Sequence, residues 1–436
     1  MLSGTFLFAI SGNLFGQSDA PIWIVLPELL TALALIGVFQ LIIKHSLVWY
    51  RRSRGTNRHP RQTKTAPSVL PTSISRQLIE IGNHCSECGK CVRDCLFLTH
   101  YGTPKSIVKS LDFTQATVQA MAYECSLCGL CAAVCPEQLD PGHLFLDVRR
   151  TYVANGLFNV SLYRTILSYE NRGRSKLFSW RGIPDGCDTV FFPGCNLPGT
   201  RMKTTIRLFR SLRRHIPKLG MVLNCCSKPS HDLGRQAHFN AAFGELRQAL
   251  QRQGIRRVLV ACPNCYKIFK EYGEGLMVQT VYEVLVENMA PVQLAHRWGP
   301  VSIHDPCAMR DNDTAQLSVR RLVADLGLEH SEMNHRGRHT LCCGEGGTVN
   351  AVHPSFAKGW GNLRAKESQD RIVITYCAGC CGFLGRRIPT VHIADLLFSP
   401  KISRLGGKKS ATRAPFTYLQ RLRLKRKLKK EFPLWS

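Results

Sequence analysis

The chain has 436 residues, of which 44% are hydrophobic, so it is long enough for two or three domains that each bury a core. This composition excludes an intrinsically disordered chain and a polytopic membrane protein. Lysine and arginine outnumber aspartate and glutamate by 58 to 30, and the formal charge of +28 favours an anionic partner: acidic lipid, an acidic redox protein or nucleic acid.

The first predicted element is a membrane-spanning helix near the N-terminus. Residues 21–43 are apolar apart from a single charge, Glu28. Trp23 and Trp49 flank this stretch about 39 Å apart along a helix, which matches the hydrocarbon core plus its interfaces. We therefore predict a transmembrane helix over 21–50 and an external tail over 1–20. A buried core helix is the alternative.

Positive charge follows the predicted helix and does not precede it. No lysine or arginine stands before Lys44, whereas residues 51–77 are strongly basic and contain three prolines. By the positive-inside rule, we expect the bulk of the chain on the cytoplasmic side of the inner membrane and a single crossing of that membrane. A cleaved signal peptide is disfavoured because the basic start of such a peptide is missing. Residues 51–77 are predicted to be a linker close to lipid headgroups.

Residues 78–150 contain two runs of the form C-x2-C-x2-C-x3-C. The runs are Cys85, Cys88, Cys91 and Cys95, then Cys125, Cys128, Cys131 and Cys135. Such runs bind [4Fe–4S] cubane clusters, and in two-cluster ferredoxins the fourth ligand of each cluster comes from the other run. That pattern gives one cubane on Cys85, Cys88, Cys91 and Cys135, and a second on Cys125, Cys128, Cys131 and Cys95. Paired zinc sites are the alternative, but these normally use two separated C-x2-C knuckles. Because the connection between the runs has room for helices, we expect a mainly α-helical domain.

A second cysteine pattern, repeated after 112 to 117 residues, begins beyond residue 186. Each copy has a lone Cys, a Cys-Cys pair and a C-x2-C. The copies are Cys195, Cys225, Cys226, Cys262 and Cys265, then Cys307, Cys342, Cys343, Cys377 and Cys380. Short apolar runs lead into the cysteines and helical patterns lie between them, which predicts α/β units with parallel sheets and cysteines at the carboxyl ends of strands. We place these domains at 186–292 and 299–400.

The repeated segments resemble the cysteine-rich CCG domain of the heterodisulfide reductase catalytic subunit. Related domains occur in iron–sulfur subunits of glycerol-3-phosphate, glycolate and lactate dehydrogenases. The matching segments are FFPGC (191–195), CCSKP (225–229), CPNC (262–265), HDPC (304–307), CCGEGG (342–347) and CAGC (377–380). The order of anchor, ferredoxin unit and two repeats resembles the fused subunit of membrane-associated heterodisulfide reductases and their bacterial relatives.

The resemblance implies that each complete set of five cysteines binds a noncubane [4Fe–4S] cluster. Two such clusters side by side can split a disulfide, and Cys225, Cys226, Cys342 and Cys343 would then lie at the catalytic centre. Ser227 stands where the motif has glycine, whereas Gly344 keeps it. We therefore expect one or two noncubane clusters, with the cluster type of the first repeat left open.

Three further residues have two possible roles each, and two cysteines lie outside the repeats. His304 is either a proton donor behind the second set of cysteines or a partner in a structural hydrogen bond at a strand end. Arg310 and Lys228 either offset the negative charge of a cluster or lie on a solvated surface. Cys187 and Cys381 fall outside the repeats and are expected to pack as small apolar groups, with Cys381 the better candidate for an auxiliary role.

Residues 401–436 form a basic C-terminal tail. Between Lys401 and Lys430 there are twelve lysines and arginines and no acid, and the interleaved apolar residues do not make one clean helical face. Contact with anionic membrane lipid is the first prediction, and a solvated disordered tail is the alternative. Nucleic acid is not expected to be a partner, because no recognised recognition module accompanies the charge.

No dinucleotide fingerprint, P-loop or C-x-x-C-H sequence is present, so flavin, nicotinamide and c-type haem have no evident site. Electrons must then pass through a separate subunit, either a haem- or quinone-binding membrane protein or a flavoprotein. We predict an oxidoreductase subunit that transfers electrons between this partner and a thiol/disulfide-type substrate. The alternative is an electron-relay subunit of a flavin-dependent glycerol-3-phosphate or 2-hydroxy-acid dehydrogenase, and a more distant one is a zinc protein that binds nucleic acid.

Overall fold

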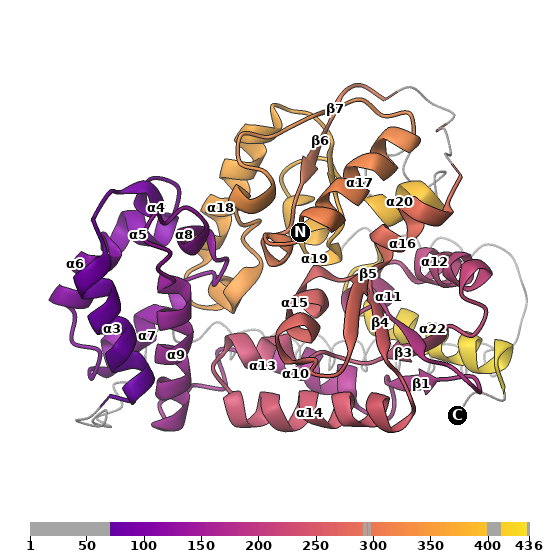
Figure 1. Cartoon of the computed structure of the whole chain (residues 1–436), viewed down its shortest axis with the longest axis horizontal. Helices are drawn as coiled ribbons and strands as arrows, with labels where there is room; N and C mark the ends of the chain where they lie inside the picture. Colours follow the sequence, from indigo (N-terminus) through magenta and orange to yellow (C-terminus); the bar gives the residue numbers. More distant parts are fainter. Residues whose placement is uncertain (1–69, 291–293, 295–297, 399–410, 434–436) are drawn as a thin grey trace, which may run out of the picture. The chain divides into compact units, whose positions relative to one another are not determined.

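The computed structural model describes residues 70–290, 294, 298–398 and 411–433 (Figure 1). All of these belong to the second of two compact units, which covers residues 65–436. The predicted tail at 1–20, the predicted transmembrane helix at 21–50 and most of the linker therefore lie outside the described residues. Within the described ranges, no helix combines the length and the apolar character needed to cross a membrane.

The first described part is built from helices only, between residues 72 and 154, as predicted for the ferredoxin unit. Its two long helices pack against each other around buried side chains such as Ile74, Ile81 and Val148. The second long helix begins where Asp140 accepts a hydrogen bond from the backbone of His143 and proline follows at the first helical position. The helices are α3 (Thr72–His84), α4 (Lys90–Arg93), α5 (Leu96–Tyr101), α6 (Pro104–Ser110), α7 (Ala116–Met121), η1 (Ala122–Glu124), α8 (Leu130–Ala133) and α9 (Pro141–Ala154).

Helix α3 corrects one predicted boundary. The linker was expected to extend to residue 77, but its last six residues, from Thr72, already form the first turns of α3. Ile74 and Ile81 are both buried and lie two helical turns apart. Because Ile74 belongs to this apolar face, the helix begins within the basic segment.

The first α/β domain contains a five-stranded sheet in the order β1-β3-β2-β4-β5. The strands are β1 (Trp180–Gly182), β2 (Thr189–Phe192), β3 (Gly220–Leu223), β4 (Arg257–Val260) and β5 (Met277–Thr280). Four of them are parallel, as predicted, but β1 pairs antiparallel with β3 at the edge. Because β1 precedes residue 186, the domain starts earlier than expected.

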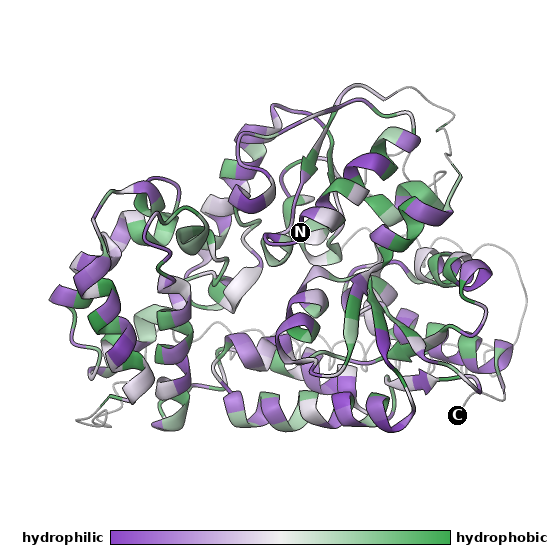
Figure 2. Ribbon diagram, viewed as in Figure 1, coloured by the Kyte–Doolittle hydropathy of each residue, from purple (hydrophilic) through white to green (hydrophobic). Residues whose placement is uncertain are grey.

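The helices of this domain follow the predicted apolar stripes. Helix α12 (Met202–His215) buries Ile206, Phe209 and Leu212, and α14 (Gln236–Arg252) ends just before Gly254. The remaining helices are α10 (Arg164–Arg174), α11 (Asn196–Thr200), α13 (Lys228–Asp232), α15 (Pro263–Tyr272) and α16 (Val281–Asn288). Figure 2 shows hydrophobic residues along the strands and a mixture of hydrophilic and hydrophobic residues along the outer helices.

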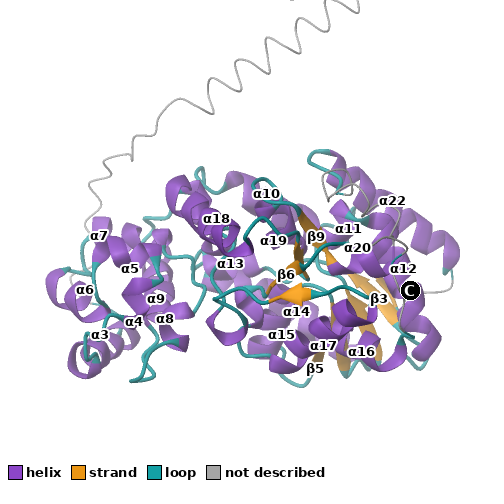
Figure 3. Cartoon of the chain, turned by 90° about the horizontal axis from the view of Figure 1, so that it is seen from above, coloured by secondary structure: helices purple, strands orange, loops and turns teal. Residues whose placement is uncertain are grey.

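The second α/β domain contains a four-stranded sheet, all parallel, in the order β7-β6-β8-β9. Its strands are β6 (Val301–His304), β7 (His330–Ser331), β8 (Val373–Thr375) and β9 (Thr390–His392). Its helices are η2 (Cys307–Met309), α17 (Asp313–Asp325), η3 (Gly337–His339), η4 (Gly346–Ala351), α18 (Pro354–Ser368), α19 (Ala378–Leu384) and α20 (Ile393–Phe398). Figure 3 shows the helices of both domains surrounding the strands.

The two α/β domains share one hydrophobic core. A single cluster of buried side chains contains Phe191 and Leu259 from the first sheet and Ile303 and Ile374 from the second. At this junction the hydroxyl of Tyr282 lies 3.3 Å from the carbonyl oxygen of Ala261 and 3.1 Å from that of Tyr376. The cysteines of both repeats are consequently held on one continuous scaffold.

The described part of the C-terminal tail is a helix, α22 (Phe416–Glu431), which packs against α11 and α12 of the first α/β domain. It buries Arg421, Leu424 and Leu428, which follow one another at intervals of three and four residues. A solvated disordered tail is therefore wrong for this segment. The buried face of this helix was not predicted, because one of its three residues is an arginine and arginine is mostly found at the surface.

Candidate iron–sulfur sites

The structure brings the first eight cysteines together in the two sets that the ferredoxin pattern gave. Burial, together with the negative charges of Cys85, Cys135 and Cys88, raises the pKa of Cys91 to about 11. The same four cysteines line one cavity, which Cys131 of the other set also reaches. In the other set, burial and the charges of Cys125, Cys128 and Cys95 raise the pKa of Cys131. Thiols that disfavour one another's ionisation in this way are suited to a shared cationic centre, which stabilises all four thiolates at once.

The two ferredoxin sets differ in their distance from solvent. Among the twenty cysteines, all of which the structure describes, Cys88 alone is exposed. In the other set, Cys95 is buried and Cys125, Cys128 and Cys131 are half-buried. The set that contains Cys88 therefore lies nearest to a redox partner arriving from solution.

The five cysteines of the first repeat form one connected group at the carboxyl ends of β2, β3 and β4. Cys195 and Cys225 share a hydrogen bond, Cys226 lies 3.5 Å from Cys265 between the sulfur atoms, and Cys262 and Cys265 share another hydrogen bond. The hydrogen bond with Cys225 is the main cause that lowers the pKa of Cys195 to about 6.

Gly194 explains the close approach of these segments. Its φ of 77° lies in the left-handed region, and a Cβ at this position would be 2.9 Å from the Cβ of Cys262 and 3.2 Å from the Sγ of Cys265. Glycine in FFPGC is thus required both by the backbone and by the space that the neighbouring C-x2-C turn occupies.

The five cysteines of the second repeat form an equivalent group. Hydrogen bonds join Cys307 to Cys342, Cys342 to Cys343, Cys343 to Cys380, and Cys380 to Cys377. Cys307 follows β6 and Cys377 follows β8, as predicted. The Cys342–Cys343 pair follows η3 instead of a strand, because β7 ends at Ser331 and a loop carries the chain back to the site.

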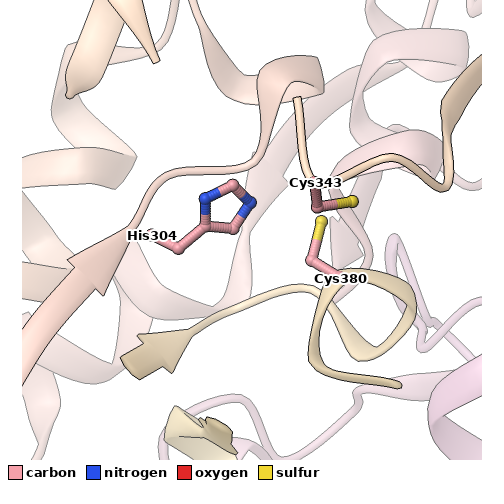
Figure 4. Close-up of side chains that lie close together, drawn as sticks. All are labelled: His304, Cys343 and Cys380. Atoms are coloured by element: carbon pink, nitrogen blue, oxygen red, sulfur yellow. The ribbon is translucent and has the colours of Figure 1, made fainter. Parts of the chain in front are cut away.

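His304 points at the second group. One ring nitrogen and the sulfur atoms of Cys343 and Cys380 all lie within 4.8 Å of one another, and the imidazole is turned toward both sulfurs (Figure 4). The side chain is fully buried, and neither ring nitrogen has a hydrogen-bond partner among the described residues. Burial lowers the pKa of His304 to about 3, so the ring is neutral near pH 7. The predicted role of His304 as a partner in a structural hydrogen bond is therefore wrong.

Packing explains why the first repeat has Ser227 where the motif has glycine. Ser227 and Gly344 both adopt positive φ, 58° and 98° respectively. A Cβ at Gly344 would lie 2.1 Å from the carbonyl oxygen of Ala357 and 2.7 Å from the ring of Phe383, so glycine is required in the second repeat. The constraint comes from these two neighbours, and the serine is therefore no sign in itself of a different cluster.

Lys228 and Glu345 lie between the two groups of five. Lys228 pairs with Asp232 at 2.5 Å and interacts electrostatically with Cys226 and with Cys307. Glu345 is exposed, although its carboxyl group interacts electrostatically with thiols of both groups. Desolvation and the charges of Cys262 and Cys195 raise the pKa of Glu345 to about 7. Sequence reasoning missed Glu345, although CCGEGG contains it, because nothing local shows that the second repeat's loop faces the first repeat's thiols.

Arg310 connects the ferredoxin unit to the second repeat. It is 4% exposed, which excludes the reading as a solvated surface charge. The guanidinium donates to the carbonyl oxygens of Cys128 (3.2 Å), Thr340 (2.8 Å) and Arg338. Cys128 in turn interacts electrostatically with Cys307 and Cys342. The second ferredoxin set is therefore adjacent to the second group of five.

Arg149 joins all three parts of the described chain. Its fully buried guanidinium, on α9, donates to the carbonyl oxygens of Ala122 and Cys125 in the ferredoxin unit. It also donates to the carbonyl oxygen of Asp232 in the first α/β domain at 2.6 Å and to that of Gly347 in the second at 2.9 Å. Nothing in the sequence near residue 149 indicated this role.

The two cysteines outside the repeats have different surroundings. Cys187 is buried and donates a hydrogen bond to the carbonyl oxygen of Thr189 at 3.1 Å. Cys381 is buried and accepts a hydrogen bond from Arg201 at 3.0 Å, while Arg201 pairs with Asp395 at 2.6 Å. Neither belongs to a group of four or five thiols.

Sets of four and five converging thiols have the donor chemistry of iron–sulfur clusters. Comparisons with known proteins agree. Residues 84–140 match the 4Fe-4S dicluster domain, and residues 189–270 and 301–385 match the cysteine-rich domain CCG.

Several curated proteins are similar to this chain, including the following three. One belongs to the fumarate reductase (CoM/CoB) of Methanothermobacter marburgensis and is 27% identical over 72% of this chain and 68% of its own length. Another belongs to the dihydromethanophenazine:CoB–CoM heterodisulfide reductase of Methanosarcina mazei and is 24% identical over 73% of this chain and 91% of its own length. A probable membrane-anchored ferredoxin of Chromohalobacter salexigens is 22% identical over 66% of this chain and 48% of its own length. The first two are single subunits of their reductases.

The fold and its thiol groups thus define an electron-transferring iron–sulfur protein with several [4Fe–4S] clusters. More closely, the chain belongs to the heterodisulfide reductase-like iron–sulfur subunits, which combine a dicluster domain with two CCG domains. The predicted family, the class of oxidoreductase subunit and the presence of several [4Fe–4S] clusters are confirmed.

Proposed function

We propose that this chain reduces a thiol/disulfide-type substrate between its two CCG domains, using electrons that arrive through the dicluster domain. The observation that carries the proposal is that both groups of five thiols are complete and that Lys228 and Glu345 lie between them. A protein that only relays electrons has no need of an acid and a base placed between two such groups.

The proposed order of electron transfer follows the contacts between the thiol groups. Electrons enter at the exposed set with Cys88 and pass to the set with Cys128. They then reach the group with Cys307, which is adjacent to Cys128, and finally the group with Cys195. The eight ferredoxin cysteines would hold two cubanes, and the ten CCG cysteines would hold one or two noncubane clusters.

The reaction consumes two electrons and two protons: the S–S bond breaks and two S–H bonds form. Bound clusters supply single electrons and iron sites with affinity for thiolate sulfur. The ammonium group of Lys228 would attract the negative charge that develops on sulfur. Glu345, with a pKa near 7, can hold and release a proton close to both groups.

We also propose that the chain is anchored at the cytoplasmic face of the inner membrane. Its electron partner there would be a haem- or quinone-binding subunit, or a flavoprotein. The support is the apolar stretch at 21–43 with its one-sided charge, and the similarity to a relative named as a membrane-anchored ferredoxin. The outward residues of α22 fit the same surface: Phe416 and Leu419 are exposed, and the exposed basic residues are Arg423, Arg426, Lys427, Lys429 and Lys430.

The test uses the full chain with its partner subunits, isolated without oxygen. Cys226→Ala and Cys343→Ala should each abolish disulfide reduction, while Cys187→Ala, a buried cysteine outside the groups, should leave it unchanged. Adding thiol to the oxidised protein should produce a new paramagnetic signal that both group variants lack. If the two variants kept full turnover, the chain would be a relay subunit and the proposed substrate site would be wrong.

A further inference from the structure

A buried, positively charged side chain from the C-terminal helix lies beside the first group of five thiols. Arg421 of α22 is 4% exposed. Its guanidinium stacks over the rings of Tyr169, on α10, and Phe178, with 5.7 and 5.5 Å to the ring centroids. Nη2 donates to the carbonyl oxygen of Gly173 at 3.4 Å.

Gly173 is the contact point between the arginine and the thiol group. A Cβ on Gly173 would lie 3.1 Å from the Cβ of Cys225, and 3.3 and 3.6 Å from Nη2 and Nη1 of Arg421. The charge of Arg421 also acts on Cys195, whose thiol shares a hydrogen bond with the hydroxyl of Tyr169. The absence of a side chain at Gly173 is what lets the guanidinium approach this closely.

The positive charge of Arg421 has no carboxylate partner in the described part of the chain. Nη1 is buried and makes no hydrogen bond there. Glu170, the neighbour of Tyr169 on α10, is not available, because its carboxylate accepts hydrogen bonds from the backbone and hydroxyl of Ser230. A buried guanidinium without a counter-charge is strongly unfavourable, so the arrangement requires an anion at this point.

We propose that Arg421 provides the counter-charge for the cluster held by Cys195, Cys225, Cys226, Cys262 and Cys265 and raises its reduction potential. One-electron reduction adds one negative charge to this site, and a fixed cation stabilises the more negative state. This inference depends on the proposed presence of a cluster in the first repeat.

The second repeat has a different electrostatic environment. His304 beside its thiols is neutral. Arg364, a buried arginine whose charge acts on Cys343 and Cys380, already pairs with the carboxylate of Glu367 at 2.5 Å. The charges of Arg310 and Lys228 act on Cys307 of the second repeat, so the two repeats differ in where their positive charges lie.

The experiment is a redox titration with dithionite, followed by electron paramagnetic resonance, on the full chain. Cys262→Ser identifies the signal that belongs to the first repeat. In Arg421→Gln the midpoint potential of that signal should become more negative. We expect a change of at least tenfold in the equilibrium constant for reduction, which corresponds to 59 mV for one electron. Arg421→Lys should shift it less, and Arg426→Gln, on the exposed side of the same helix, should not shift it.

Iron and acid-labile sulfide are measured on every variant. If the wild-type chain has no cluster in the first repeat, the proposed function fails before Arg421 is tested. If Arg421→Gln has full iron and an unchanged midpoint potential, the role of Arg421 is wrong.

A second variant covers the case in which Arg421→Gln loses the cluster. Thr417→Glu places a carboxylate one turn earlier on α22, where it can pair with Arg421 and neutralise it without removing it. The midpoint potential should again become more negative. An unchanged potential in Thr417→Glu would overturn the proposal.

Discussion

The guanidinium of Arg149 donates a 2.9 Å hydrogen bond to the carbonyl oxygen of Gly347, although 198 residues separate the two in sequence. Gly347 follows the Cys342–Cys343 pair, and another nitrogen of the same guanidinium binds the carbonyl oxygen of Cys125. One side chain thus sets the position of a ferredoxin ligand relative to a CCG loop. Electron transfer between adjacent clusters depends on such distances.

We expect Arg149→Met to lower the free energy of unfolding by about 3–5 kcal/mol, because four buried carbonyl oxygens lose their donor. Arg150→Met is the matched control on the same helix, since Arg150 is half-buried and pairs with Asp147 in a contact worth less than about 1 kcal/mol. Thermal unfolding followed by circular dichroism measures both. Equal stability of the two variants would contradict the role of Arg149.

Gly344→Ala should prevent cluster assembly in the second repeat, because the new methyl group would meet the backbone of Ala357 at 2.1 Å. Ser227→Gly, at the corresponding position, should keep full iron content and gain up to about 1 kcal/mol of stability by relieving the positive φ. Iron analysis and thermal unfolding distinguish the two. Normal iron content in Gly344→Ala would show that the loop moves freely.

His392 makes stability depend on pH. The ring is fully buried, and burial holds its pKa well below 6.5. The unfolded chain therefore binds a proton that the folded chain does not. The stability contributed by the neutral ring is present above about pH 6.5 and is lost, by about 1.4 kcal/mol per unit, as the pH falls below it.

Substitution of His392 isolates this effect. Its Nδ1 accepts a hydrogen bond from the backbone of Ala394 at 3.2 Å, and asparagine can accept the same bond without titrating. Denaturation between pH 5 and 7.5 should show a smaller loss of stability in His392→Asn than in the wild type. Parallel profiles would mean that other groups account for the acid sensitivity.

His304 can be tested by copying the first repeat. Phe192 stands three residues before Cys195, as His304 stands before Cys307. His304→Phe should make the midpoint potential of the second repeat's cluster more negative, because a polar ring within 4.8 Å of the sulfurs of Cys343 and Cys380 stabilises added negative charge better than a phenyl ring does. His392→Asn is the control for loss of a buried histidine. An unchanged potential with full iron would assign His304 a packing role only.

Membrane attachment should have two separable components. Deleting residues 1–50 should remove attachment that resists salt. The remaining attachment should weaken with salt and fall further when Arg426, Lys427 and Lys430 are replaced by glutamate, since each basic residue near anionic lipid contributes about 1 kcal/mol. Flotation with vesicles of neutral and anionic lipid measures both. Equal binding to the two kinds of vesicle would contradict a headgroup contact of α22.

The sequence predicted the thiol groups well because their information is local. Cysteines at fixed spacing fall on one loop, and apolar runs such as 189–192 and 257–260 are strands that end beside them. The residues that relate one group to another were not predictable. Contacts with residues far away in the sequence give Arg149, Glu345 and Arg421 their roles. The sequence around each of them predicts only a charged surface residue.

The C-terminal tail, for which a disordered segment was the alternative prediction, shows the same limit. Helix α22 has Arg421, Leu424 and Leu428 on its buried side, but its mean composition is that of a solvated basic helix. The buried side of the helix meets a surface that includes the rings of Tyr169 and Phe178, over which the guanidinium of Arg421 stacks. A pattern of apolar residues alone cannot anticipate a cation–π contact.

The exposure of Cys88 has a practical consequence for handling this protein. Dioxygen reaches that corner of the molecule first, so the iron bound there would be the first to be lost in air. A sample damaged in this way would keep most of its brown colour and its other centres, yet it would no longer accept electrons from outside. Low turnover in a coloured preparation would then indicate loss of the cluster that accepts electrons from the partner, and not an inactive substrate site.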